Sequence, residues 1–189
     1  GLANTQLHPK GTRHSKGLLF GPTVERATTY RNLLADNHDR NPLYQGPHRN
    51  NEMINNYVFN CEFCTRILDG RPENSSPSDT VEGMHVINNY FDTKFNASRA
   101  LIGGTGMDGT YVSGNVKSPG TGQEFRTEDA LPSPGGYSAV DSNAIVPAES
   151  LLESLLPVVG AVWPRRDAVD SRILNEVTTQ ETYGWRGIP

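Results

Sequence analysis

Two clusters of basic residues near the start of the chain could form a site for an anion. Lys16 lies in the first cluster and Arg40 in the second, and the interval between them equals that from Asn32 to Asn56 in a repeated pattern. If the fold repeats at this interval, the two cations occupy equal positions in adjacent strands, about 4.8 Å apart. Two cations at that distance repel each other, so the pair is easier to explain if an anionic ligand lies across it. We therefore expect a cationic face that binds an anion.

The repeated pattern is a short apolar strand with paired asparagines. Residues 54–58 (Ile-Asn-Asn-Tyr-Val) return as residues 87–91 (Ile-Asn-Asn-Tyr-Phe), with weaker copies upstream and downstream. The recurring asparagines are Asn32, Asn56, Asn89 and Asn115. Their intervals fall in the range of roughly 20–50 residues that indicates a repeat architecture. A unit of short strand plus polar turn favours a β-solenoid over a helical one.

The repeated asparagines have a physical role in such a solenoid. Asparagine tolerates the left-handed backbone conformation of a sharp corner. Stacked asparagines can also hydrogen-bond from one coil to the next. We expect the apolar neighbours to stack inside, residues 69–80 to form a polar loop, and residues 118–142 to be irregular.

The chain has a different pattern after residue 145. Leu151, Leu155 and Val159 have helical spacing behind Pro147, and Pro157 ends or kinks that helix. A second amphipathic helix follows within residues 165–177. We predict an all-β chain with parallel β-helix coils over residues 1–145 and a helical extension over residues 146–189, which packs on the coils and protects their open edge.

Bulk properties narrow the classes of function. The net charge of −4 argues against nucleic acid as a partner, and an acidic ligand needs a local basic patch. No apolar stretch is long enough to span a bilayer, and we expect no membrane partner. We also expect a monomer. The first residue is Gly1, which we interpret as a cut or processed start.

The two cysteines, Cys61 and Cys64, leave alternatives open. A zinc site requires further ligands, and no second cysteine pair exists. In a strand the two residues lie about 10 Å apart at ~3.3 Å per residue, which is too far for a disulfide. Two half-buried thiols or a turn-closing bridge remain.

Several of these segments resemble the pectate lyase family, the largest group of polysaccharide lyases. The resemblance is carried by residues 14–21 (His-Ser-Lys-Gly-Leu-Leu-Phe-Gly) followed by residues 38–42 (His-Asp-Arg-Asn-Pro). The asparagine-rich strands and residues 165–172 (Arg-Arg-Asp-Ala-Val-Asp-Ser-Arg) are similar to the family as well. The resemblance implies a secreted right-handed parallel β-helix that cleaves polygalacturonate by β-elimination.

The resemblance also implies roles for individual residues. Arg40 matches the arginine that takes the C5 proton of the uronate, and Lys16 matches a lysine that binds the substrate carboxylate. The family often has another arginine shortly after the catalytic one, at the position where this chain has Gln45. The full set of expected substrate-binding residues is Lys16, Lys10, His14, Gln45, His48 and Arg49, with His48 or Arg49 as substitutes for the missing arginine and Lys10 as a rival of Lys16.

A calcium ion is the cofactor that the resemblance implies. Calcium takes carboxylate oxygens from protein and substrate together. The family's calcium ligands lie before the Lys16 motif, so we expect them upstream of residue 1 and assign no metal ligand in this chain. Because a guanidinium is ordinarily protonated, Arg40 is an unusual base, and a charge-stabilising role with water as the base stays open.

Less specific interpretations stand beside these predictions. Arg40 could pair with Asp39 or Asp36 at a solvated turn, and Lys16 could be an ordinary surface lysine. The main functional alternative to a lyase is a non-catalytic β-helix module that binds acidic polysaccharide. Two further functional alternatives are a purely structural solenoid and a lyase that acts on methylated pectin.

Overall fold

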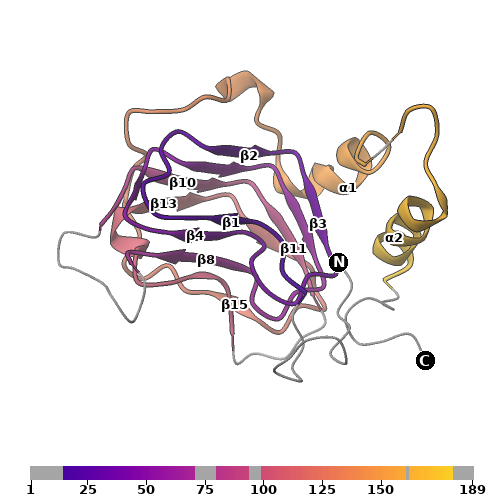
Figure 1. The fold of residues 1–189 in the computed structure, drawn as a ribbon, viewed down its shortest axis with the longest axis horizontal. Helices are drawn as coiled ribbons and strands as arrows, with labels where there is room; N and C mark the ends of the chain where they lie inside the picture. The colour runs from indigo at the N-terminus through magenta and orange to yellow at the C-terminus, as the bar shows by residue number, and fades with distance from the viewer. Residues whose placement is uncertain (1–14, 71–79, 94–98, 161, 181–189) are drawn as a thin grey trace.

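The computed structural model describes residues 15–70, 80–93, 99–160 and 162–180, and their regular secondary structure is mostly parallel β-sheet (Figure 1). The largest sheet has the strand order β1-β4-β8-β12-β15 and comprises β1 (Leu19–Phe20), β4 (Leu43–Gln45), β8 (Thr65–Leu68), β12 (Ala100–Gly103) and β15 (Glu124–Phe125). The second sheet comprises β2 (Thr28–Tyr30), β6 (Glu52–Ile54), β10 (Met84–Ile87) and β13 (Thr110–Ser113). The third comprises β3 (Leu33–Ala35), β7 (Tyr57–Phe59), β11 (Tyr90–Asp92) and β14 (Val116–Lys117).

The chain visits the sheets in a fixed order. It passes through β2, β3 and β4, then through β6, β7 and β8, then β10, β11 and β12, and then β13, β14 and β15. Each pass therefore adds one parallel strand to each sheet. A two-stranded sheet of β5 (His48–Arg49) and β9 (Val81–Glu82) lies between the first and second sheets along the chain. The prediction of a chain built mostly from parallel strands is confirmed.

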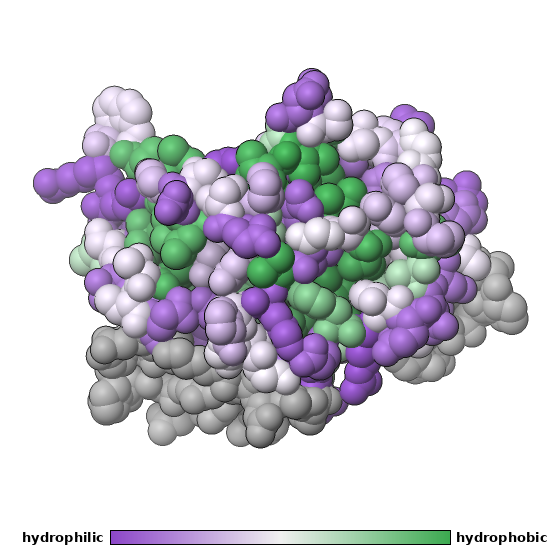
Figure 2. Space-filling model, turned by 180° about the vertical axis from the view of Figure 1, so that it is seen from behind, coloured by the Kyte–Doolittle hydropathy of each residue, from purple (hydrophilic) through white to green (hydrophobic). Residues whose placement is uncertain are grey.

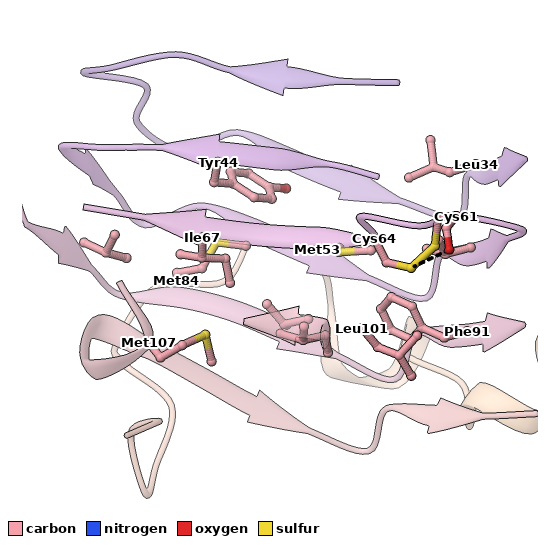
Figure 3. Packing of buried hydrophobic residues seen from close by; sticks show 14 residues of the cluster. Leu34, Tyr44, Met53, Cys61, Cys64, Ile67, Met84, Phe91, Leu101 and Met107 are labelled. Carbon is pink, nitrogen blue, oxygen red and sulfur yellow. Dashed lines mark hydrogen bonds between the residues drawn. A yellow bond between two sulfur atoms is a disulfide. The ribbon is translucent and has the colours of Figure 1, made fainter. Parts of the chain in front are cut away.

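The core lies between the sheets because alternate residues of each strand point inward. Equivalent positions stack in register, as Tyr44 does on Ile67 and Leu34 on Val58. Figure 3 shows these side chains between the strands. The core cluster consists of Leu34, Tyr44, Met53, Val58, Cys61, Cys64, Ile67, Val81, Met84, Val86, Phe91, Leu101, Ile102 and Met107.

The two cysteines form a disulfide within this core (Figure 3). Cys61 and Cys64 lie in the turn between β7 and β8, where their Cα atoms are 5.2 Å apart. The expectation of half-buried thiols is wrong and the turn-closing bridge is correct. The distance argument against a bridge assumed an extended strand, whereas the chain bends between these residues.

A ladder of asparagine side chains joins successive passes at the corner between the second and third sheets. Asn32 donates to Asn56 at 3.0 Å, Asn56 to Asn89 at 3.0 Å, and Asn89 to Asn115 at 2.8 Å. Each acceptor oxygen also binds the backbone N–H of the preceding asparagine in the ladder. The predicted coil-to-coil hydrogen bonding at these four positions is confirmed.

The predicted backbone conformation of these asparagines is wrong by one residue. The left-handed conformation belongs to the residue before each ladder asparagine, namely Arg31, Asn55, Asn88 and Gly114, with φ from 50° to 63°. Two neighbouring residues of the turn therefore have different roles. One residue makes the corner, and the next one points its amide inward to satisfy the backbone.

The C-terminal segment covers the outer face of the third sheet. Helix α1 (Leu151–Leu155) follows a 3₁₀ turn that begins after Pro147, and α2 (Ala168–Thr179) lies beside it (Figure 1). Tyr57, Phe59, Leu151, Leu155 and Val177 form a second apolar cluster between sheet and helices. The predicted packing of both helices on the β structure is confirmed.

Two expectations for this half of the chain need correction. Residues 118–142 are not entirely irregular, because β15 adds a fifth strand to the first sheet and Leu131 forms a bridge with Tyr111. Val169 is 55% exposed, so the apolar face of α2 is narrower than its spacing indicates. The expected polar loop falls mostly on residues 71–79, which lie outside the described residues.

The molecular surface shows hydrophobic and hydrophilic residues interleaved on the face seen in Figure 2. Exposed apolar residues include Val158 and Trp163, both in the connection between α1 and α2. None of the described helices combines the length and the apolar character needed to cross a membrane.

A buried carboxyl pair lies where α2 meets the sheet. Glu176 is 1% exposed and Asp36, directly after β3, is 4% exposed. Burial, together with the hydrogen bond and the charge of Asp36, raises the pKa of the Glu176 carboxyl to about 7, although its ion pair with Arg172 opposes this. The Glu176 carboxyl therefore holds its proton to a higher pH than an ordinary carboxyl does.

Removal of one rung of the asparagine ladder should destabilise the fold. Asn56→Ala leaves the Asn32 backbone N–H without its acceptor and removes one of the two donors to the Asn89 side-chain oxygen, at a site where Asn56 and Asn89 are fully buried. We expect a loss of about 2–4 kcal/mol in the free energy of unfolding, measured by urea denaturation. Asn175→Ala, on the exposed side of α2, is the control and should change it by less than about 0.5 kcal/mol. Equal effects of the two variants would contradict the ladder's role.

The Glu176 proton should make stability depend on pH. Because its folded-state pKa lies above that of an ordinary carboxyl, this group stabilises the fold at low pH, and the contribution disappears as the pH rises through about 7. We expect the Tm of wild type to fall relative to Glu176→Gln between pH 6 and pH 8, at roughly 2–4 °C per kcal/mol. Glu153→Gln, exposed on α1, should follow wild type, and a wild-type Tm that rises relative to Glu176→Gln would refute the raised pKa of the Glu176 carboxyl.

Candidate functional site

Arg40 occupies the corner between β3 and β4 with a left-handed backbone, φ 65°. Its carbonyl accepts a hydrogen bond from the Leu18 N–H at 2.8 Å, which ties this corner to the preceding pass. The side chain is half-buried, and its Nε atom is enclosed without a hydrogen-bond partner. The guanidinium forms no ion pair with any residue that the structure describes. Its charge is thus not neutralised by a described carboxylate.

The two carboxylates nearest to Arg40 in sequence have other partners. Asp39 forms an ion pair with Arg66 of β8, with Nη2 and Oδ1 2.8 Å apart, and is only 8% exposed. Asp36 accepts a hydrogen bond from the Asn60 amide at 2.6 Å. The simple alternative, in which one of these carboxylates neutralises Arg40, is therefore not what the structure shows.

Lys16 lies next to this corner but not at the position equivalent to Arg40. The backbone of Lys16 forms a parallel bridge with Asp39. Leu19 nevertheless pairs with Leu43, so the second corner contains one residue more than the first. The prediction that Lys16 and Arg40 occupy equal positions is wrong by one residue, because an equal interval in the sequence does not reveal an extra corner residue. Lys16 and Arg40 still belong to neighbouring strand connections.

The other predicted binding residues lie away from Arg40. Gln45 is at the opposite end of β4, half-buried beside Leu68. His48 is 2% exposed, and burial lowers its pKa to about 4, so the ring is neutral and has no surface for a polymer. We correct its assignment from substrate contact to core residue.

Arg49 is exposed but lies in the small β5–β9 sheet, where it pairs with Glu82 across 3.3 Å. The structure thus brings Lys16 and Arg40 together and separates both from the β5 residues. Lys10 and His14 lie outside the described residues.

A cationic groove on the first sheet was not anticipated. Its walls are Phe63, Thr65, Arg66, Arg99, Ala100, Gly103, Gly104 and Arg126, which enclose about 240 Å³. The charged residues of this lining are three arginines. Such a surface suits a ligand that carries several negative charges, because each guanidinium offers a planar set of donors to a carboxylate.

The alternation of strand residues explains why the arginines share one face. Thr65 and Ile67 of β8 point inward and are fully buried, so Arg66 between them points outward. Gly103 of β12 is in register with Arg66, and the Arg126 N–H donates to the carbonyl of Ile102 at 2.9 Å. Because Gly103 has no side chain, it leaves a hollow between the two arginines.

A signal in the sequence could have revealed this groove. Arg40, Arg66, Arg99 and Arg126 recur at intervals that closely follow those of the ladder asparagines. The arginines therefore recur once per pass of the chain, as the asparagines do. The asparagine pattern draws attention first because its flanking residues repeat as well, whereas the residues around the arginines do not.

Calcium, the cofactor implied by the resemblance, does not fit the described residues. Among them there is no group of three or more His, Cys, Asp or Glu that could hold a metal ion. Asp36 and Asp39 are already engaged by Asn60 and Arg66.

Comparison with known proteins gives no family assignment. No protein-family model and no curated protein sequence matches the chain.

Proposed function

We propose that this chain is part of a secreted pectate lyase that binds polygalacturonate and cleaves it by β-elimination. One observation carries the proposal. Arg40, which no described carboxylate neutralises, lies in the corner that leads into β4, a strand of the sheet that carries the three-arginine groove. Polygalacturonate presents one carboxylate per sugar, so a row of anions meets a row of cations on one sheet.

The proposed fold is a right-handed parallel β-helix. Support comes from the cyclic passage of the described strands, from β2 to β15, through three parallel sheets. The proposed domain bounds are residues 1–145 for the coils and residues 146–189 for the helical extension. The buried Cys61–Cys64 disulfide suits a secreted protein, because oxidising compartments preserve such bonds.

The chemical step removes a weakly acidic proton. In our proposal the neutral form of the Arg40 side chain takes the C5 proton of the uronate and becomes a guanidinium, the C5–H electron pair forms a C4–C5 double bond, and the C4–O bond breaks. The leaving oxygen then takes a proton. Lys16 binds the carboxylate on C5, where negative charge develops during proton loss, and a fixed cation there stabilises the transition state.

The groove has a separate task in this proposal. Arg66, Arg99 and Arg126 hold carboxylates of sugars beyond the one that reacts. Arg66 and Arg126 are two strand spacings apart, about 9.6 Å, so they contact different sugars of an extended chain. The binding energy from these distant sugars places the reacting uronate beside Arg40.

The alternative is a module that binds acidic polysaccharide without cleaving it. A specific observation favours it, since the groove lining contains neither Arg40 nor Lys16. Binding and cleavage thus depend on different residues, and variants can separate them.

Loss of Arg40 should abolish cleavage and preserve binding. Arg40→Ala removes the proton acceptor, so we expect the rate of formation of unsaturated uronate to fall by roughly 10²–10⁴-fold. The measurement is the new ultraviolet absorbance on polygalacturonate, with calcium and after chelation. Arg165→Ala, an exposed arginine before α2, is the control and should retain full activity. If wild-type protein binds the polymer without producing absorbance, the lyase proposal is wrong and the non-catalytic binding module is the remaining hypothesis.

Loss of the groove cations should weaken binding. Arg99→Gln and Arg126→Gln keep a polar side chain but remove its charge, and we expect each to raise the Kd for tetragalacturonate about fivefold at physiological salt, measured by calorimetry. The effect should shrink as salt is added, because ions screen exposed charges. Arg165→Gln is the matched control. A Kd that none of these variants changes would place the binding surface elsewhere.

A further inference from the structure

One aromatic residue contacts two of the three groove arginines. The Phe63 ring lies 5.2 Å from the guanidinium carbon of Arg66 and 4.4 Å from that of Arg99. Both distances are within the range of a cation–π contact. Phe63 belongs to the groove lining itself, so these contacts occur at the site where a ligand meets the protein.

The position of Phe63 is fixed by its turn. The residues on either side of the pair Glu62–Phe63 are Cys61 and Cys64, which form the buried disulfide. The Phe63 N–H donates to the carbonyl of His38 at 2.9 Å, and the His38 ring meets the Phe63 ring edge-on at a centroid distance of 5.6 Å. The ring is thus held by the turn and by the preceding corner.

Contact with a ring differs from contact with a carboxylate in its effect on the cation. A carboxylate neutralises a guanidinium and occupies its donors. An aromatic face stabilises the charge from one side and leaves the N–H groups at the edge of the guanidinium plane available. Arg99 illustrates this, since it forms no ion pair with a carboxylate among the described residues while its guanidinium lies over the ring.

We propose that Phe63 is a positioning residue for anion binding. From its disulfide-closed turn it holds Arg66 and Arg99 in fixed orientations, so that their outer edges receive two carboxylates of one anionic sugar chain. This inference rests on the proposed function, because it concerns the same groove. The groove's preference for a multiply charged sugar chain then depends on an uncharged ring, and the anion does not need to contact that ring.

The structure gives Arg66 and Arg99 different degrees of restraint. Arg66 has a second contact in its ion pair with Asp39, whereas Arg99 is exposed and stacks on Phe63. Replacement of Phe63 should therefore release Arg99 more than Arg66. The binding defect of a Phe63 variant should accordingly depend on the presence of Arg99.

The test is a double-mutant cycle between Phe63 and Arg99. Phe63→Leu keeps an apolar side chain and removes the ring, and we expect it to raise the Kd for tetragalacturonate about three- to fivefold. Phe63→Tyr preserves the ring face and should stay within about twofold of wild type. In the Arg99→Gln background, Phe63→Leu should have little further effect. A change in Tm alone cannot produce this pattern, so it separates positioning from a structural role.

The outcomes distinguish this inference from the proposed function. If wild type fails to bind tetragalacturonate, the proposed function falls and this inference falls with it. If wild type binds and Phe63→Leu weakens binding equally with and without Arg99, only the positioning role is overturned. Should Phe63→Leu fail to fold, Phe63→Met enters the same cycle, and the same dependence on Arg99 is required of it.

Discussion

The register between successive passes of the chain is the constraint on which the rest of the structure depends. A parallel stack of short strands has many corners, and each corner exposes backbone groups that the sheets do not pair. The asparagine ladder resolves this at one corner. Asn56 accepts from the backbone and side chain of Asn32 and donates to Asn89, while a second proton of its amide binds the carbonyl of Thr29. Because an unsatisfied buried amide is costly, a one-residue slip of any pass is strongly disfavoured.

The groove follows from that register. Strands of the first sheet are fixed relative to those of the other two, so Arg66, Gly103 and Arg126 stay on the outer face while Tyr44 and Ile67 stay inside. The passes differ in length, and the differences fall in the connections between strands. Cations at the edge of the sheet can therefore occupy equivalent positions in successive passes, although the loops between the strands differ in length.

Residues that repeat together with their neighbours were predictable from the sequence. The four ladder asparagines and the stacked apolar residues beside them could be assigned because several positions recur at once. Helix α1 was predictable from the spacing of leucines behind Pro147, and α2 from the apolar spacing within residues 165–177. Exact corner geometry was not predictable. The left-handed residue precedes each asparagine, and one additional corner residue changes the backbone partner of Lys16 from the expected Arg40 to Asp39.

The partners of charged residues were the least predictable part of the site. A parallel stack brings residues one pass apart in the chain closer together than residues of the same turn. Sequence neighbours indicated Asp39 as the partner of Arg40, whereas Asp39 pairs with Arg66 in the next strand of the same sheet.

The pairing of Asp39 with Arg66 has a consequence for the charge of the whole face. The chain has a net charge of −4, and charges more than about 8 Å apart are largely screened at physiological salt. A local balance of charge thus decides whether an anion binds. Asp39 offsets one arginine and leaves Arg40, Arg99 and Arg126 without a described acidic partner, so the face remains cationic although the chain is acidic. The ring of Phe63 stabilises part of that charge without cancelling it, so the cationic character of this face is preserved.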